Sequence, residues 1–518
     1  MAHRWLRAAA LVTLCICVAG QVALADDDET SGQTGLDKAS HDNASRSASR
    51  DDSTRDHERA RRLPQDSANH QSITLADGRV LNFTASAGSM RLRDERGQDE
   101  AVIGFVAYKL DAGEAKTRPV TFAFNGGPGA GSAWLDIGAI GPWRLPMEPG
   151  KIYPSAPPVL VDNHETWLDF TDLVFIDPPG TGYSRIVADG DAAKRKFWSV
   201  HGDIRALSEV VRRWLARNDR TESPKFIVGE SYGGFRGPLL AQELATNQGV
   251  GISGLVLISP VLDFGADAGA FSWLDRLPAY AAAYREERGP VTRIDLADVE
   301  RYATSDYLQD FMRGPRDVDA VSRMVQNVTQ FTGLDPALVK RLGGRIDKTT
   351  FQREHERAEG KVVGAYDATV SAYDPDPTSN YNEWLDPAVT GLEAPMTSAI
   401  VGLYSDKLNW KIDRPYNILS EQVFRGWNWG DRPQPPSSME QLRAMLALDS
   451  KFRVLVTGGL TDIQVPYLQN KRMLDQVPDY GVPGRLQFKV YPGGHMFYSR
   501  DDSRKVLHAD AEALVTGQ

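Results

Sequence analysis

A serine stands between two glycines at the end of a short apolar run, in the segment Gly229-Glu-Ser-Tyr-Gly233. The preceding run, residues 225–228, has the composition of a buried β-strand. In a G-x-S-x-G segment between a strand and a helix, a tight turn projects the serine hydroxyl above the sheet. The N-terminus of the helix then faces any negative charge that develops on a carbonyl oxygen. The pattern predicts that Ser231 is a nucleophile.

A nucleophilic serine needs a general base, and in this arrangement the chain order is Ser, then Asp or Glu, then His. Of the nine histidines, only His495 and His508 follow both the serine and a plausible acid. His495 lies in a glycine-rich loop directly after a predicted strand, 486–491, whereas His508 lies in a polar C-terminal helix. We therefore expect His495 to be the base.

The acid that orients the histidine should follow the preceding core strand. Asp462 comes after the apolar run 454–456 and two glycines, where its carboxylate would hold the imidazole and stabilise the imidazolium. Asp475 and Asp479 occur later, at more polar positions, and are the alternatives.

An oxyanion hole needs two convergent backbone N–H groups. One is expected from Tyr232, the residue after the serine, and the other from a glycine-rich loop after an early strand. The loop Asn125-Gly-Gly-Pro-Gly129 follows the predicted strand 120–124 and supplies Gly127. A phosphate-binding loop would continue with Gly-Lys-Ser/Thr, which this loop does not.

Short apolar strands alternate with helical stretches over most of the chain. Strands are predicted at 120–124, 173–176, 226–228, 255–258, 452–456 and 486–491, and an amphipathic helix at 203–217. Residues 73–108 instead contain runs separated only by turn signals, which is typical of antiparallel strands. The pattern predicts an α/β protein with a mostly parallel central sheet covered by helices on both faces.

Composition divides the 518 residues into five segments. We expect a signal peptide at 1–25, a disordered leader at 26–70, the first part of the core at 71–264, a large, mainly helical insertion or lid at 265–448, and the second part of the core at 449–518. The leader has almost no large apolar residues. Insertions at this edge of a sheet commonly cover the site, although the aromatic residues here would also suit a core of the insertion itself.

The first segment has the features of a secretory signal. Basic residues precede the apolar run 8–19, and Ala23-Leu-Ala25 offers a cleavage site before Asp26. The run is short for a bilayer span, with an uncleaved anchor as the alternative. Both cysteines, Cys15 and Cys17, lie here, so the mature chain would contain no disulfide. We expect export to a bacterial periplasm or the medium, without stable membrane insertion. The net charge of −10 argues against a nucleic-acid partner.

Together these segments resemble the serine carboxypeptidases, peptidase family S10. The matching pieces are Asn125-Gly-Gly-Pro-Gly129, Phe175-Ile-Asp-Pro-Pro-Gly-Thr-Gly-Tyr-Ser184, Gly229-Glu-Ser-Tyr-Gly-Gly234, Thr461-Asp462 with Val465-Pro466, and Gly494-His495-Met496. They occur in the family's order, and an ordinary esterase shares only the serine segment. The resemblance implies an α/β-hydrolase fold, removal of C-terminal residues from peptides through an acyl-enzyme, and no requirement for a metal or cofactor.

The resemblance also implies that Asn125, Gly126 and Glu230 bind the terminal carboxylate of the substrate. Two adjacent carboxyl groups must share a proton, so the pKa of Glu230 is expected to be raised and activity to be favoured at acidic pH. A hydrogen bond that only supports the serine turn is the alternative role for Glu230.

The chain departs from the family at two places. An acidic residue usually precedes the family's Leu/Asn-Gly-Pro segment, but this chain has Ala139-Ile-Gly-Pro142, so the acid is missing unless Asp136 replaces it. Ala130 and the absence of cysteine after the signal remove the usual disulfides. The first departure leaves esterase, amidase or acyltransferase activity as alternatives.

Overall fold

The computed structural model describes residues 63–113, 116–147, 153–378, 386–430 and 433–517. The predicted signal peptide and most of the predicted leader therefore lie outside the described residues. The leader prediction is wrong at its C-terminal end, because strand β1 spans Ser67–Thr74. β1 pairs with β2, from Ser67 opposite Ala87 to Thr74 opposite Val80. Its backbone is held by this pairing at the sheet edge, which does not require the large apolar residues that the segment lacks.

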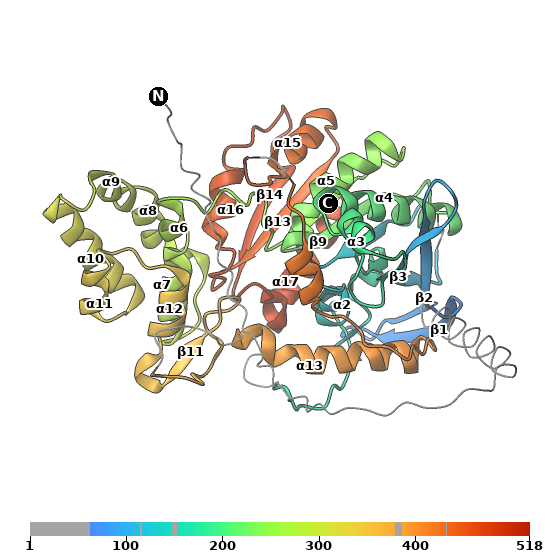
Figure 1. Ribbon diagram of the computed structural model, residues 1–518, viewed down its shortest axis with the longest axis horizontal. Helices are drawn as coiled ribbons and strands as arrows, with labels where there is room; N and C mark the ends of the chain where they lie inside the picture. The colour runs from blue at the N-terminus through green and yellow to red at the C-terminus, as the bar shows by residue number, and fades with distance from the viewer. Residues whose placement is uncertain (1–62, 114–115, 148–152, 379–385, 431–432, 518) are drawn as a thin grey trace, which may run out of the picture.

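A ten-stranded sheet runs through the molecule in the order β1-β2-β3-β7-β4-β9-β10-β13-β14, with β8 beside β3 (Figure 1). The strands after β1 are β2 (Val80–Arg93), β3 (Asp99–Leu110), β4 (Val120–Phe124), β7 (Asp172–Ile176), β8 (Arg185–Ile186), β9 (Lys225–Glu230), β10 (Gly254–Ile258), β13 (Arg453–Gly459) and β14 (Leu486–Tyr491). The pairs from β1 to β7 are antiparallel, and those from β7 to β14 are parallel. The predicted mostly parallel sheet with an antiparallel beginning is confirmed.

The central strands are buried on both faces, which explains their continuous apolar runs. In β4, Phe122 and Phe124 face one apolar layer, whereas Ala123 faces the other. The first layer is built with α4 (Val200–Arg217), α5 (Tyr232–Asn247) and α15 (Met439–Leu448), and the second with α2 (Ala133–Leu135), α13 (Pro387–Gly402) and α17 (Asp501–Thr516). The helix predicted at 203–217 is α4, which begins earlier because the Ser199 hydroxyl caps it by accepting from Gly202 N–H at 3.1 Å.

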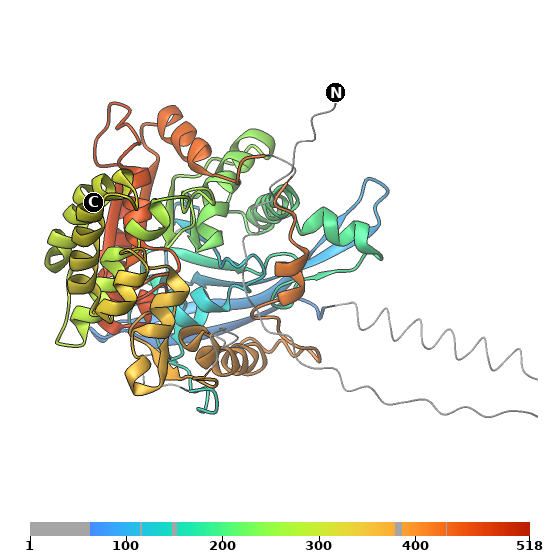
Figure 2. The same cartoon turned by 60° about the vertical axis from the view of Figure 1, so that its left-hand side comes forward.

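The segment 265–448 is not one lid. Its first helices are α6 (Phe271–Leu274), α7 (Leu277–Glu286), α8 (Ala297–Thr304), α9 (Asp306–Arg313), α10 (Val318–Thr332), α11 (Pro336–Arg341) and α12 (Lys348–Glu354). They have a core of their own, which continues onto α16 (Tyr467–Leu474). In Figure 1, α8–α11 lie at the left end of the molecule, on the β14 side of the sheet and away from β1–β3, and in Figure 2 they come forward on the left. The later helices α13 and α15 instead belong to the two apolar layers beside the sheet, where α13 packs on α2 and α15 packs on α5.

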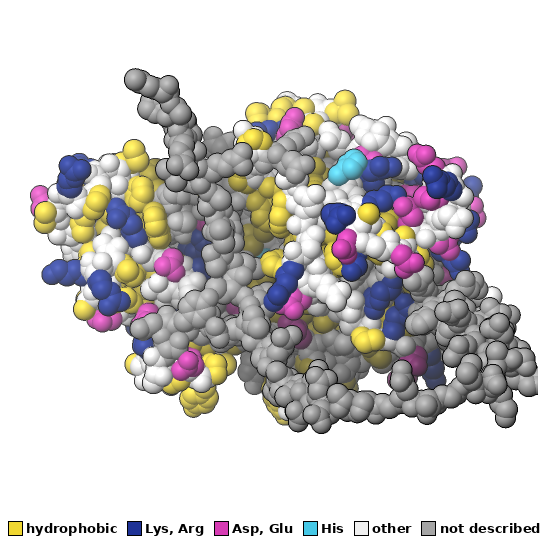
Figure 3. Space-filling view, in the orientation of Figure 1, with side chains coloured by type: hydrophobic (Ala, Val, Ile, Leu, Met, Phe, Trp, Pro, Cys, Tyr) yellow, Lys and Arg dark blue, Asp and Glu magenta, His cyan; other side chains and the backbone are white. Residues whose placement is uncertain are grey.

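A connection after α13 ties the insertion to the N-terminal strand. The Ser67 hydroxyl and the Asn69 amide both donate to the Leu408 carbonyl, at 2.5 and 2.8 Å, and Trp410 Nε1–H donates to the Gln65 carbonyl at 2.9 Å. On the face seen in Figure 3, acidic and basic side chains are interspersed. Within the described ranges, no helix combines the length and apolar character needed to cross a membrane.

Candidate active site

Ser231 lies at the tight turn between β9 and α5. Its backbone has φ 58° and ψ −120°, a conformation that costs energy for any residue other than glycine. The two flanking glycines approach closely: a Cβ on Gly229 would lie 2.0 Å from the Gly233 carbonyl oxygen. Any larger residue at Gly229 would therefore force this turn open, which explains the spacing of the two glycines around the serine.

Asp462 and His495 are joined by a buried hydrogen bond. His495 Nδ1 lies 2.7 Å from Asp462 Oδ2, and the two residues are 2% and 0% exposed. The other oxygen, Asp462 Oδ1, accepts from the backbone N–H groups of Gln464 and Val465 at 2.9 and 2.8 Å. The carboxylate is thus held from two sides and fixes the ring plane of the histidine.

The end of β10 brings the predicted base and nucleophile to the same part of the sheet edge. Ser231 N–H donates to the Ile258 carbonyl at 2.9 Å, and the hydroxyl of the next residue, Ser259, donates to the His495 carbonyl at 2.8 Å. β10 lies between β9 and β13, so the loop after β14 folds back across two strands. Ser231, Asp462 and His495 therefore gather at the C-terminal ends of β9, β13 and β14.

The outer nitrogen of His495 is available to accept a proton. A carboxylate can only accept, so Nδ1 carries the proton toward Asp462 and Nε2 is left as an acceptor. Nε2 is buried and has no hydrogen-bond partner among the described residues. Burial lowers the pKa of His495, but the nearby carboxylates of Asp462 and Glu230 outweigh this effect and raise the pKa above its usual value. These are the properties of a general base.

The alternative histidine and acids lie elsewhere. His508 lies on α17, and its Nε2 is 3.2 Å from Asp169 Oδ1. Asp475, at the C-terminal end of α16, forms an ion pair with Lys471 of that helix at 2.6 Å, and Asp479 is exposed.

The glycine-rich loop after β4 packs directly against the serine turn. A Cβ on Gly126 would lie 2.5 Å from the Tyr232 backbone nitrogen, so the two segments touch through their backbones. Arg236 of α5 donates to the Asn125 carbonyl at 2.6 Å and ties the loop to the helix. In the part of the chain that the structure describes, no acceptor is recorded for the N–H of Gly127 or of Tyr232. The loop therefore brings these two donors, which we predicted as the oxyanion hole, next to the nucleophile.

Glu230 is buried beside Ser231 and is surrounded by donors. Asn125 Nδ2 donates to Glu230 Oε2 at 2.5 Å, and the Tyr498 hydroxyl is 3.0 Å from both carboxyl oxygens. Asn125 Oδ1 accepts from Leu135 N–H at 2.9 Å, which fixes the orientation of the amide. Burial raises the pKa of Glu230 to about 7, although His495 and the two hydrogen bonds act in the opposite direction. A group with this pKa changes protonation near neutral pH.

Asp136 does not complete this carboxyl site. It is buried, and its Oδ2 accepts from the Tyr108 hydroxyl at 3.2 Å. Burial raises the pKa of Asp136 well above the usual range, and the nearby Asp177 carboxyl raises it further. The hydrogen bonds and charges around Asp136 thus belong to a separate cluster, and the hydroxyl that contacts Glu230 is that of Tyr498.

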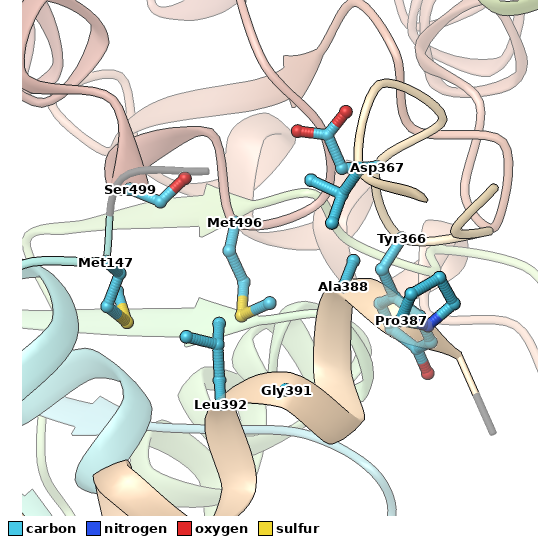
Figure 4. A pocket seen from close by; sticks show the side chains of 10 residues that line it. Met147, Tyr366, Asp367, Pro387, Ala388, Gly391, Leu392, Met496 and Ser499 are labelled. Atoms are coloured by element: carbon cyan, nitrogen blue, oxygen red, sulfur yellow. The ribbon is translucent and has the colours of Figure 1, made fainter. Parts of the chain in front are cut away.

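A cavity of about 50 Å³ opens beside the histidine loop. Met496 points toward Leu392 of α13, and Met147 and Tyr366 lie on opposite sides of these two side chains (Figure 4). The Tyr366 ring also meets the His495 ring edge-on, with centroids 5.0 Å apart. The cavity is therefore mostly apolar and adjoins the predicted base.

Asp367, in the insertion, holds the loops of both predicted triad partners. Its Oδ1 accepts from the Thr461 hydroxyl at 2.7 Å, and its Oδ2 accepts from Gly494 N–H at 3.0 Å. Thr461 directly precedes Asp462, and Gly494 directly precedes His495. Sequence reasoning missed Asp367 and Tyr498. Asp367 had no recognisable motif around it, whereas Tyr498 lies three residues after His495 and its proximity was the available signal.

Comparison with known proteins supports the resemblance. Residues 81–272 match the family model described as serine carboxypeptidase. The chain is similar to the serine carboxypeptidases. Two Arabidopsis thaliana relatives are serine carboxypeptidase-like 2, with 26% identity over 182 residues, and serine carboxypeptidase-like 13, with 27% identity over 172 residues. The matches cover 33% and 32% of this chain and only 39% and 38% of those relatives.

A solved structure extends the similarity at the level of the fold. The crystal structure of Kex1Δp, a prohormone-processing carboxypeptidase from Saccharomyces cerevisiae, superposes with a TM-score of 0.54. It is 15% identical and covers 84% of this chain and 91% of its own. The similarity of the two folds confirms the predicted α/β-hydrolase fold.

Proposed function

We propose that this protein is a serine-type carboxypeptidase. Ser231 attacks the carbonyl carbon of the last peptide bond while His495 Nε2 takes its proton, and Asp462 stabilises the imidazolium. The N–H groups of Gly127 and Tyr232 stabilise the oxyanion. His495 then protonates the leaving amine, and water hydrolyses the acyl-enzyme by the same steps. These residues require no cofactor for this chemistry.

The observation that supports a chain-end substrate is the buried Glu230–Asn125 pair beside the nucleophile. Hydrolysis by the triad needs no carboxyl group at this position. Below its pKa Glu230 carries a proton, so its O–H, together with an amide N–H of Asn125, can bind a carboxylate, while Gly126 keeps the loop backbone close enough to contact it. An uncharged C-terminal amide would gain less from these donors.

The test compares an N-blocked dipeptide as the free acid with its C-terminal amide at pH 6. We expect kcat/KM for the acid to exceed that for the amide by about 10- to 100-fold, since a hydrogen bond to a charged group contributes about 1.5–3 kcal/mol. A fluorophosphonate probe should label the wild type and leave Ser231→Ala unlabelled. Equal cleavage of acid and amide by a labelled enzyme would contradict the carboxypeptidase proposal.

Esterase, amidase or acyltransferase activity is the second candidate. It is favoured by the placement of Asp136 with Tyr108, which leaves Glu230 without a second carboxyl partner in the described residues. Rapid turnover of simple esters without selectivity for a free carboxylate, or product transfer to an added amine or alcohol, would support this candidate.

We also propose that the protein is exported by the signal at residues 1–25, whose structure lies outside the described residues. Sequencing of the mature N-terminus from fractionated cells should give Asp26 as the first residue. A mature chain that retains Met1 would contradict this proposal.

A further inference from the structure

Tyr498 occupies an unusual position in the candidate site. It lies in the short helix η6 (Phe497–Ser499), three residues after the predicted base, and is completely buried. Its hydroxyl is equally distant, 3.0 Å, from Glu230 Oε1 and Oε2. One proton is therefore shared between two acceptors and is not committed to either oxygen.

The Tyr498 ring is also close to the cavity beside the histidine loop. Its sequence neighbours Met496 and Ser499 both line that cavity. Gly138 lies close to both Tyr498 and Met147: a Cβ built on it would be 3.4 Å from Tyr498 Cε2 and 3.0 Å from Met147 Cε. Met147 also lines the cavity. The Tyr498 side chain thus connects the cavity wall with the Glu230 carboxyl.

The number of donors from which the Glu230 carboxyl can accept depends on whether it is protonated. An ionised carboxylate only accepts and can use both Asn125 Nδ2 and the Tyr498 hydroxyl. A protonated carboxyl group becomes a donor and accepts less strongly, so one of these donors is released. The hydroxyl of Tyr498 can rotate about its C–O bond, whereas the Asn125 amide is fixed by Leu135 N–H.

We propose that Tyr498 is a further binding residue for the terminal carboxylate, and that its hydroxyl turns from Glu230 to the substrate when the substrate binds. This inference rests on the proposed carboxypeptidase function. A neutral phenol then does part of the work expected of the acid that the Ala139-Ile-Gly-Pro142 segment lacks. Burial and Glu230 hold the pKa of Tyr498 well above its usual value, so the hydroxyl remains a donor throughout the working pH range.

Loss of the Tyr498 hydroxyl should shift the pH dependence of activity in one direction. The titratable groups that face the Glu230 carboxyl are Tyr498, His495, Asp462 and, from the insertion, Tyr366. The Tyr498 hydrogen bond lowers the pKa of Glu230. Removing the hydroxyl should therefore raise that pKa and keep Glu230 protonated to higher pH.

The experiment measures Tyr498→Phe on the free-acid dipeptide and its amide between pH 5 and 9. We expect KM for the acid to rise about 10-fold or more, from the loss of a hydrogen bond to a charged group, with the amide affected less than about 2-fold. The acid/amide ratio of kcat/KM should fall accordingly. The alkaline limb of the acid profile should move to higher pH.

The matched control is Tyr467→Phe, because Tyr467 is also buried and its hydroxyl donates to a carboxyl, Glu300 Oε1, at 2.9 Å. It should change neither the ratio nor the limb. Active-site titration with the fluorophosphonate normalises each variant to its folded fraction. If Tyr498→Phe does not fold, Tyr498→Met removes the hydroxyl with a flexible side chain that fills irregular space.

Two results would overturn the inference, and they have different consequences for the proposed function. Equal losses on acid and amide, with an unmoved limb and with wild-type selectivity for the acid intact, would reduce Tyr498 to a structural role and leave the proposed function standing. A wild type that lacks selectivity for the acid would remove both the proposed function and this inference.

Discussion

Glu230 illustrates, at the scale of single residues, how burial sets a functional property. Removal from water raises its pKa to about 7, while Asn125 and Tyr498 favour the ionised form. In water the same carboxyl would be ionised at neutral pH and would repel a peptide carboxylate. The buried group instead keeps its proton on the acid side of neutrality.

The first prediction concerns Glu230→Gln. Glu230 loses its proton as the pH rises through about 7, so wild-type kcat/KM for free-acid peptides should decline about 10-fold per pH unit above that value. Glutamine stays a neutral donor at every pH, so the variant should lose this alkaline decline and stay within about 10-fold of the wild type at pH 6. The measurement is kcat/KM from pH 5 to 9 on the acid substrate.

The acidic side of that profile provides the internal control. It reports the neutral form of His495, and in Glu230→Gln it should persist and move only toward lower pH, because Glu230 helps to raise the pKa of His495. An alkaline decline that persists in Glu230→Gln would assign it to another group, and a wild-type kcat/KM that rises steadily from pH 5 to 8 would contradict the role of Glu230.

At the scale of elements, the site depends on two loops that the insertion helps to hold together. Besides the two side-chain contacts of Asp367, the Ala368 N–H donates to the Thr461 carbonyl at 3.0 Å, and the His495 N–H donates to the Tyr366 carbonyl at 2.5 Å. The segment 366–368 thus contacts the loops after β13 and β14 at the residues where they carry Asp462 and His495.

The second prediction is that Asp367→Asn lowers kcat more than it changes KM. Each carboxyl oxygen of Asp367 accepts from a backbone N–H, Oδ1 from Thr369 and Oδ2 from Gly494, both at 3.0 Å. A backbone N–H can only donate, so the new amide N–H₂ must oppose one of these two groups. A displaced Asp462–His495 pair should reduce kcat about 10- to 100-fold, while KM for the free acid changes less than about 3-fold. Steady-state kinetics and the rate of fluorophosphonate labelling both report this split.

Asp376→Asn is the matched control, because Asp376 lies on the same insertion but is exposed. It should leave kcat, KM and labelling unchanged. A proportional loss of kcat and of folded protein in Asp367→Asn, with normal kinetics per labelled site, would show that Asp367 supports the fold rather than the geometry of the triad.

At the scale of the whole molecule, a buried ion pair joins the helical layer to the glycine-rich loop after β4. Arg236 of α5 and Asp203 of α4 are 1% and 0% exposed, and Arg236 Nε lies 2.7 Å from Asp203 Oδ2. The same guanidinium donates to the Asn125 carbonyl. One side chain therefore links two helices and the loop that carries Gly127.

The third prediction is that Arg236→Met lowers the free energy of unfolding by about 3–5 kcal/mol, because it leaves Asp203 buried without its charge partner. The double variant Asp203→Leu with Arg236→Met should recover much of this loss, since it removes the uncompensated charge. Denaturant unfolding of the single and double variants measures the difference.

Activity separates the two roles of Arg236. The double variant should regain stability but keep a reduced kcat. The Asn125 carbonyl has still lost its donor, so the glycine-rich loop after β4 is no longer held to α5. A double variant that is no more stable than Arg236→Met would contradict the charge argument.

The sequence by itself determined the parts whose signals are local. Short apolar runs between helical stretches predicted the sheet, and the strand ends predicted the order of Ser231, Asp462 and His495 along its edge. Local patterns suffice here because parallel strands bring their C-terminal ends to one edge whatever lies between them.

Only the tertiary structure decided which distant residues meet at that edge. Tyr498 and Glu230 are 268 positions apart, and Asp367 and Gly494 are 127 apart. The tertiary structure also decided that Asp136 faces Tyr108 rather than Glu230. It likewise decided that α13 and α15 join the apolar layers beside the sheet instead of forming a lid. Such contacts depend on how whole layers pack, and packing depends on the shape and volume of many side chains at once, which no short segment of sequence encodes.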